Sequence, residues 1–244
     1  MGSSFGIISQ TGNNIQTEGL IAYWDAAYKK SYPGSGTTWY DLSGNNNNIT
    51  MTNATWNSGG YWLFDGIEDY GIISSLSGFS NTTNVTVFCG FKPGFSAGSA
   101  DNGGRGALFG FGAAAGTTND VYHWGSSNSN AFGLNTWNSD SWGVDDVVTY
   151  DDENTIGTFQ LKFGGSNTTG FNMFINGIEQ TESQVKGSTL TRTRSTKFGI
   201  GCNGWHISNQ TWTGRIYYMA IYNRATSSGN ALQNYQAQKG RFGL

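Results

Sequence analysis

Short alternating runs of apolar and polar residues, separated by glycine-rich turns, constrain this chain more than any other feature. The run Val85–Phe91 places apolar residues at every second position, which is the period of a half-buried strand. The run Phe171–Ile175 leads into Asn176-Gly177 and then into a further strand-like segment. Asn-Gly between such runs strongly indicates a hairpin, because both turn positions favour positive φ. The local patterns therefore predict antiparallel strands joined by tight turns.

Strand-like runs of this kind recur from Gly19 to Tyr222. In Tyr217–Tyr222 both faces are apolar, which predicts a strand that is covered on both sides. The other predicted strands are Leu20–Trp24, Tyr61–Phe64, Tyr70–Ile73, Ala107–Phe111, Phe159–Phe163, Ile178–Gln180, Phe198–Cys202 and Arg215–Tyr222.

A single helix is expected near the C-terminus. Ser227 or Ser228 can cap it, Ala231, Leu232, Tyr235 and Lys239 follow at helical spacing, and Gly240 is the predicted stop. Many short strands with one late helix predict an all-β fold, a two-sheet antiparallel jelly-roll sandwich with one short C-terminal helix over residues 228–239.

Composition agrees with this class and limits the function. Glycine is roughly twice as frequent as usual and charged residues, at 12%, are about half as frequent. Aromatic residues make up 15% of the chain and supply apolar area for a core. The net charge of −3 argues against binding to nucleic acid through its phosphates, and no apolar run is long enough to span a bilayer.

The chain ends and cysteines give weaker indications. Residues 1–18 are polar and weakly patterned, and we interpret them as an extended N-terminal arm, either disordered or used for attachment, before a single domain over residues 19–244. No signal peptide is recognised, so synthesis in the cytoplasm is expected. Cys89 and Cys202 both lie in strand-like runs; two buried thiols are favoured, with a disulfide between them as the alternative.

Motifs for catalysis are weak. Gly94–Gly98 matches the G-x-S-x-G nucleophile elbow around Ser96, but a Gly/Ser loop follows it where a helix is required. Gly199–Gly204 matches G-x-G-x-x-G but does not open a predicted helix, so we interpret it as a glycine-rich strand end. No pair of acidic residues has the arrangement of a glycosidase site; Glu68-Asp69 are adjacent, and Glu179 and Glu182 lack an acidic residue between them. We therefore expect no enzyme activity.

Two oxygen-rich segments are candidates for calcium, and otherwise no cofactor is expected. Asp145, Asp146, Asp151 and Asp152 form an acidic cluster, although their spacing is not that of an EF-hand loop. Asp41 with the run of asparagines at 45–48 is the second, equally weak candidate. Solvated loops are the alternative for both.

Loop aromatic residues beside amides are candidates for glycan binding. Sugars stack on aromatic rings while amides and other polar groups bind the hydroxyls. A core-filling role is the alternative for any single tryptophan. The candidates are Trp124, Trp137, Asn138, Trp142 and His206.

Several blocks resemble laminin-G-like, concanavalin A-like jelly-roll domains of tailed bacteriophages, of the T4-like kind that infects cyanobacteria. The blocks are Gly19–Ala26, Ser31–Asn45, Phe64–Tyr70, Asn84–Pro93 and Gly214–Leu244. The match covers roughly residues 19–244, with a loose middle at about 98–155. The resemblance implies a two-sheet sandwich, a virion-associated role and often carbohydrate recognition.

Three functions follow as hypotheses. The first is a non-catalytic virion protein, a capsid decoration or tail-associated protein, present in several copies and contacting other virion proteins. The second is a lectin-like receptor module of a tail fibre that binds host surface glycans. The third, a glycoside hydrolase or esterase, lacks a catalytic constellation in the sequence.

Overall fold

The structure is a computed structural model. It describes residues 14–80, 84–94, 106–112, 120–126, 129–135, 141–144, 152–162, 171–181, 184–185, 195–204 and 211–244. For most of the residues in four of the strands, β9, β10, β11 and β15, the description is confined to the backbone.

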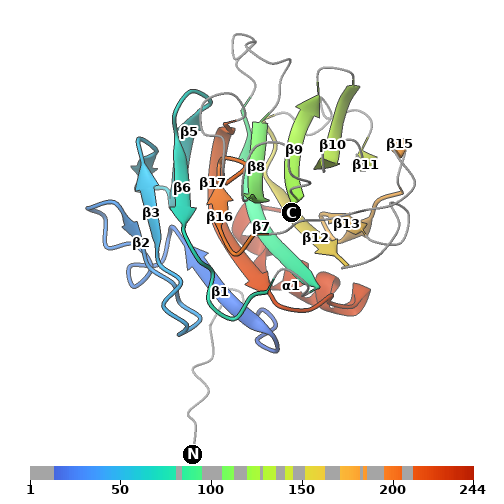
Figure 1. The fold of residues 1–244 in the computed structure, drawn as a ribbon, viewed down its shortest axis with the longest axis horizontal. Helices are drawn as coiled ribbons and strands as arrows, with labels where there is room; N and C mark the ends of the chain where they lie inside the picture. The colour runs from blue at the N-terminus through green and yellow to red at the C-terminus, as the bar shows by residue number, and fades with distance from the viewer. Residues whose placement is uncertain are drawn as a thin grey trace, which may run out of the picture.

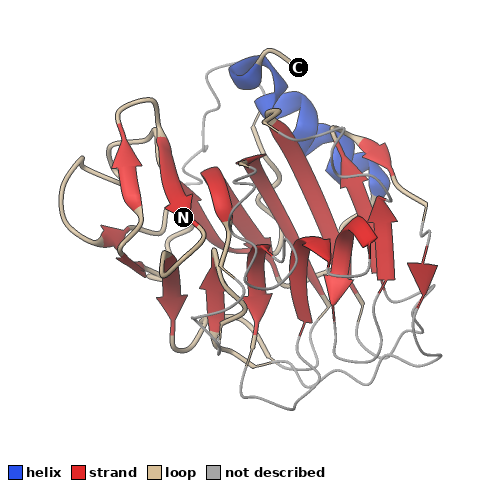
Figure 2. Cartoon of the chain, turned by 90° about the horizontal axis from the view of Figure 1, so that it is seen from above, coloured by secondary structure: helices blue, strands red, loops and turns tan. Residues whose placement is uncertain are grey.

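Two antiparallel sheets are stacked on each other (Figures 1 and 2). The eight-stranded sheet has the order β14-β13-β12-β7-β17-β5-β4, with β1 beside the second half of β17. Its strands are β1 (Leu20–Asp25), β4 (Thr55–Asn57), β5 (Tyr61–Asp65), β7 (Val85–Pro93), β12 (Thr155–Leu161), β13 (Phe171–Ile175), β14 (Ile178–Glu179) and β17 (Thr213–Tyr222).

The nine-stranded sheet has the order β15-β11-β10-β9-β8-β16-β6-β3-β2. Its strands are β2 (Thr38–Trp39), β3 (Ile49–Thr52), β6 (Tyr70–Ile73), β8 (Gly106–Phe111), β9 (Asp120–Ser126), β10 (Ser129–Asn135), β11 (Ser141–Val144), β15 (Gln184–Val185) and β16 (Phe198–Ile200). The predicted class, a two-sheet antiparallel sandwich with one C-terminal helix, is confirmed.

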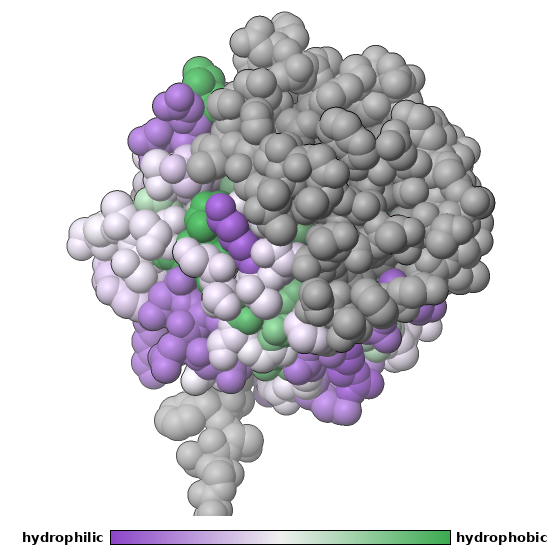
Figure 3. All heavy atoms as spheres, in the orientation of Figure 1, coloured by the Kyte–Doolittle hydropathy of each residue, from purple (hydrophilic) through white to green (hydrophobic). Residues whose placement is uncertain are grey.

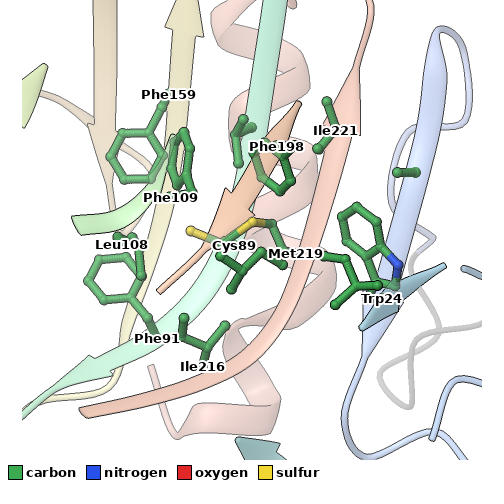
Figure 4. Close-up of a cluster of buried hydrophobic side chains, with 14 of the residues drawn as sticks. Trp24, Cys89, Phe91, Leu108, Phe109, Phe159, Phe198, Ile216, Met219 and Ile221 are labelled. Atoms are coloured by element: carbon green, nitrogen blue, oxygen red, sulfur yellow. The ribbon is translucent and has the colours of Figure 1, made fainter. Parts of the chain in front are cut away.

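An aromatic core fills the space between the sheets (Figure 4). Trp24, Phe109 and Phe198 are fully buried there, and the rings of Trp24 and Phe198 stack with centroids 6.1 Å apart. Because each large ring buries roughly 150–250 Å², aromatic side chains compensate for the modest content of aliphatic residues. Cys89 and Cys202 are buried as free thiols, so the favoured interpretation of the cysteines is confirmed.

Two turns predicted from local sequence lie where they were expected, and they differ in which strands they join. Asn176 (φ 50°) and Gly177 (φ 79°) form the predicted hairpin turn between β13 and β14. The sequence also allows a tight turn at Asp65-Gly66, between the predicted strands Tyr61–Phe64 and Tyr70–Ile73. Gly66 does have positive φ (85°), but β5 and β6 belong to different sheets, so this turn carries the chain across the sandwich.

Helix α1 (Ser228–Phe242) covers part of the outer face of the eight-stranded sheet (Figure 2). Ser227 is the N-cap, as predicted, and it accepts a hydrogen bond from the Asn230 N–H. The helix passes Gly240, the predicted stop, and ends at Gly243, whose left-handed conformation (φ 72°) provides the C-cap. An exposed glycine costs a helix only about 1 kcal/mol, which tertiary contacts at Phe242 offset. Within the described residues no helix is long and apolar enough to cross a membrane.

The end of the predicted N-terminal arm lies against this helix. Ile15 is buried, the Gln16 N–H donates to Asn234 Oδ1 over 2.9 Å, and the Tyr222 hydroxyl donates to the Gln16 carbonyl over 3.0 Å. Glu18 pairs with Arg224. Residues 1–13 lie outside the described part of the chain, so the arm itself stays a prediction.

Candidate functional site

Two of the five residues predicted to contact a glycan lie on described strands. Trp124 belongs to β9 and Trp142 to β11. Trp137, Asn138 and His206 lie outside the described residues. In sequence, Trp137 and Asn138 fall between β10 and β11, and His206 comes two residues after the turn that follows β16.

The backbone register assigns the two tryptophans to different cross-strand rows. His123 of β9 pairs with Gly133 of β10, Gly133 pairs with Trp142 of β11, and Trp142 pairs with Gln184 of β15. Trp124 is one residue further along β9 and belongs to the next row. Residues directly opposite one another in antiparallel strands share a face of the sheet. We call His123, Gly133, Trp142 and Gln184 the outer row.

Neighbouring residues show that this row lies on the outer face. Leu134, next to Gly133, is fully buried in the core between the sheets. A Cβ atom on Gly143, next to Trp142, would lie only 2.4 Å from Cε of Met173, which belongs to the opposite sheet. Because successive strand residues belong to opposite faces, Gly133 and Trp142 lie on the outer face. By the same parity Trp124 belongs to the core side.

A turn after β16 borders the outer row. A Cβ on Gly199 would lie 2.7 Å from the Gly204 nitrogen, and one on Gly110 would lie 2.9 Å from the Asn203 carbonyl oxygen. Residues 201–204 therefore fold back over the outer face of β16 and β8, next to β9. This close approach explains the G-x-G-x-x-G pattern without a nucleotide: the glycines allow the turn to lie on its own sheet, and no helix follows within residues 201–204.

The outer row brings two aromatic residue types and one amide onto the same face of neighbouring strands. His123 and Trp142 are two strands apart, or about 9.6 Å at the usual strand spacing, with only Gly133 between them. An indole ring, an imidazole and an amide are the groups that proteins use to stack on a sugar and bind its hydroxyls. Toward β2, β3 and β6 the described surface in this view is polar to neutral, with small separate apolar spots (Figure 3).

The Asp41 loop is structural and leaves no carboxylate oxygen for a metal. Asp41 Oδ1 accepts from the N–H groups of Tyr23 (2.9 Å) and Ser43 (2.8 Å), and Oδ2 accepts from the Ser43 hydroxyl (2.7 Å) and the Asn47 N–H (3.0 Å). Asn47 extends the network by donating to the Ile21 carbonyl over 2.7 Å. The carboxylate therefore ties the loop to β1, as expected for a residue that bonds nearby backbone N–H groups.

The acidic cluster is described only in part. Asp152 forms an ion pair with Lys92, Oδ1 to Nζ 3.0 Å, while Asp145, Asp146 and Asp151 lie outside the described residues. Over the described part of the chain, no group of three His, Cys, Asp or Glu residues is close enough to hold a metal ion.

Acidic residues considered for hydrolysis serve the fold. Burial raises the pKa of Asp69, the Asp65 N–H that it accepts over 2.7 Å opposes this rise, and the nearby Asp65 carboxylate adds to it. Glu68 is exposed, and Glu179 accepts from the Asn172 amide over 3.0 Å. Ser96 and Glu182 lie outside the described residues.

The two-sheet architecture and its register define a concanavalin A-like β-sandwich. Domain 4 of AbnA, a GH43 extracellular arabinanase from Geobacillus stearothermophilus, solved in complex with arabinotriose, shares this fold. It has a TM-score of 0.64 and 15% identity, with 89% of this chain and 98% of that domain covered.

Two further solved structures are similar over a part of their length. Trypanosoma rangeli sialidase matches with a TM-score of 0.67 and 14% identity over 94% of this chain. This chain spans only 34% of that sialidase. The binding domain of botulinum neurotoxin serotype D matches with a TM-score of 0.56 and 13% identity, covering 91% of this chain and 52% of that chain. No protein-family model and no curated protein sequence matches this chain.

Sequence reasoning missed three members of the outer row, His123, Gly133 and Gln184. None of them carries a local signal for this role, because membership depends on which strands pair and in which register.

Proposed function

We propose that this chain is a non-catalytic glycan-binding module whose binding surface is the outer row of β9, β10, β11 and β15. The observation that carries the proposal is that Trp142, His123 and Gln184 share one outer-face row with a glycine between the two aromatic residues. The shared fold with a domain solved with arabinotriose supports a sugar as the ligand.

In this proposal each predicted residue has a distinct task. Trp142 stacks on one face of a sugar ring, and His123 and Gln184 exchange hydrogen bonds with hydroxyl groups. Trp137 and Asn138 fall between Gly133 and Trp142 in sequence and, like His206, stay predicted glycan contacts outside the described residues. Trp124 belongs to the core side by register and has no part in the proposed binding surface.

The test is a broad glycan array followed by calorimetric titration of the best ligand. Trp142→Ala is expected to weaken binding about tenfold or more, because one lost aromatic contact with its buried area is worth about 1.5 kcal/mol or more. Trp142→Phe should retain part of the affinity. Tyr28→Ala is the matched control, since Tyr28 is an exposed aromatic residue in the loop after β1. Absence of binding to every glycan, or unchanged affinity in Trp142→Ala, would contradict the proposal.

The non-catalytic part of the proposal has a separate test. Incubation with arabinan, sialylated and other polysaccharides should release no product. Hydrolytic activity that copurifies with the protein and is lost in a single-residue variant would contradict the non-catalytic assignment.

A virion-associated role, with several copies contacting other virion proteins, is a second candidate that rests on the sequence resemblance to phage jelly-roll domains. Two of the sequence blocks that carry this resemblance, the Asp41 loop and α1, have roles in folding in the structure. Immunogold electron microscopy with antibody to this chain is the test. Label over the head would support a decoration protein, label at the tail would support a receptor-binding module, and unlabelled particles would overturn the virion role.

A further inference from the structure

Part of the outer face of the eight-stranded sheet lies beyond the end of α1. The helix ends with Phe242, whose ring packs on Tyr217 with centroids 4.8 Å apart. Further along, the first half of β17 runs between β5 and β7. Tyr61, Leu63, Lys92 and Arg215 share this part of the face, and we call them the β17 strip. Leu63 is 45% exposed, and the other three are partly exposed.

Two cations lie directly opposite each other in the β17 strip. Arg215 is the register partner of Lys92 on one side and of Leu63 on the other. Directly opposite residues have Cβ atoms about 4.5–5.5 Å apart, and like charges in that position destabilise a sheet. The chain has only 13 lysines and arginines in 244 residues, so this pairing is not the result of a generally basic surface.

The two cations are compensated unequally. Lys92 has Asp152 as its partner. The Arg215 guanidinium lies over the ring of Tyr61, 4.6 Å from the centroid, and in the described parts of the chain no carboxylate forms an ion pair with it. Asp65, two residues from Leu63 on β5, uses Oδ1 to accept the Ile67 N–H. Arg215 therefore has a cation–π contact but no described carboxylate to neutralise its charge, and such incomplete compensation beside a second cation is typical of a functional position.

We propose that the β17 strip binds the carboxylate of an acidic sugar, as in a uronic acid polymer. The guanidinium fork matches a carboxylate in a bidentate pair, and the Tyr61 ring lies under the guanidinium, 4.6 Å from it. Leu63 provides an apolar surface for the C–H groups of the sugar, and Lys92 adds a second positive charge. The choice of a sugar as the carrier rests on the proposed glycan binding, but the site is on the opposite sheet from Trp142.

The experiment is affinity electrophoresis and calorimetry with polygalacturonate, compared with the same polymer after methyl esterification, which removes its charges. Wild-type protein is expected to bind the acidic form at about 50 mM salt, to bind it more weakly at about 300 mM because the charges are screened, and to show little binding to the ester. Arg215→Gln should weaken binding to polygalacturonate about tenfold or more. Arg215→Lys keeps the positive charge but loses the forked guanidinium. Its affinity for polygalacturonate should therefore fall between those of wild type and Arg215→Gln.

Arg224→Gln is the matched control, since it removes the same charge from a residue that pairs with Glu18 elsewhere on the surface. It should bind like wild type, and near-ultraviolet circular dichroism should show all variants folded. Equal binding of Arg215→Gln and wild type would overturn the inference. So would loss of polygalacturonate binding in Trp142→Ala but not in Arg215→Gln.

The two proposals fail in distinguishable ways. If the protein binds only neutral glycans, and Trp142→Ala abolishes this binding, the proposed function stands and the acidic-sugar site is overturned. Poly-glutamate is a second probe. If it binds as tightly as polygalacturonate and this binding depends on Arg215, the β17 strip binds acidic protein segments, and the proposal of a sugar ligand is overturned. Binding to no glycan of any kind would overturn both.

Discussion

The C-terminal helix is held to the sheet by a buried ion pair whose removal has a calculable effect. Arg241 Nη1 lies 2.8 Å from Asp25 Oδ2, and the two side chains are only 20% and 12% exposed. Asp25 also accepts from the Ala27 N–H over 2.9 Å and from the Tyr23 hydroxyl over 3.1 Å. Arg241 Nη2 donates to the Gly60 carbonyl over 3.4 Å. The pair therefore joins α1 to β1 and to the turn before β5.

Arg241→Met keeps much of the side-chain volume and leaves the Asp25 carboxylate without its cation. Breaking a buried pair in this way costs about 3–5 kcal/mol, and the residual exposure of both groups favours the lower end, about 3 kcal/mol. For a chain of 150–250 residues each kcal/mol corresponds to about 2–4 °C in Tm. The expected fall in Tm is therefore about 6–12 °C.

Scanning calorimetry of Arg241→Met, Lys239→Met and Asp25→Asn/Arg241→Met tests this reasoning. Lys239 is in the same part of the helix, partly exposed, and its ammonium lies 5.8 Å from the Tyr235 ring centroid, so its loss should lower Tm by about 2 °C or less. The double variant should recover part of the loss, because no charge is left unpaired. If Arg241→Met melts within about 2 °C of Lys239→Met, the ion pair does not hold the helix, and the argument is refuted.

Two further predictions concern titratable groups. Because burial raises the pKa of Asp69, the folded state disfavours its charged form, and wild-type stability falls as pH rises from the ordinary pKa of an aspartate to the raised one. Asp69→Asn keeps an acceptor for the Asp65 N–H and should raise Tm relative to wild type more at pH 7 than at pH 3; an equal difference at both pH values would contradict this. Burial raises the pKa of Cys202 to about 11 and that of Cys89 well above its usual value, so a thiol reagent at pH 8 should label neither until denaturant unfolds the chain. Labelling of the native protein within minutes would contradict this and show that β7 or the turn after β16 opens.

Sequence patterns predicted the strands, turns and helix cap that are determined by interactions within a few residues. The apolar faces of β17 follow from burial on both sides, and the Asn176-Gly177 turn follows from its two positive φ angles. The alternation in β7 predicted a half-buried strand and was wrong on this point, because the strand is buried on both faces from Val85 to Phe91 and Phe88 packs against Tyr218 on the outer face. The helix stop was wrong because Gly240 is tolerated where Phe242 packs on Tyr217 and Tyr218, and that contact joins segments far apart in sequence. The turn at Asp65-Gly66 was correctly placed, but nothing local shows that it joins two sheets.

The candidate site was less predictable than the fold. Sequence selected Trp124 and Trp142 on the same grounds, an aromatic residue in a polar region. The register separates them, since Trp142 shares the outer face with Gly133 and Trp124 belongs to the core side. Asp41 was a candidate ligand for calcium from its composition alone, whereas its hydrogen bonds show that it anchors a loop to β1.

The sequence by itself determined that this chain forms short antiparallel strands, an aromatic core and one capped C-terminal helix, because side-chain period, turn conformation and capping act over a few residues. Only the tertiary structure decided which strands are neighbours. Strand pairing uses backbone hydrogen bonds that are the same for every residue, and a shift of one residue moves every side chain to the other face. The outer row around Trp142 and the opposition of Arg215 to Lys92 both depend on that register, and both proposed binding surfaces therefore come from the fold.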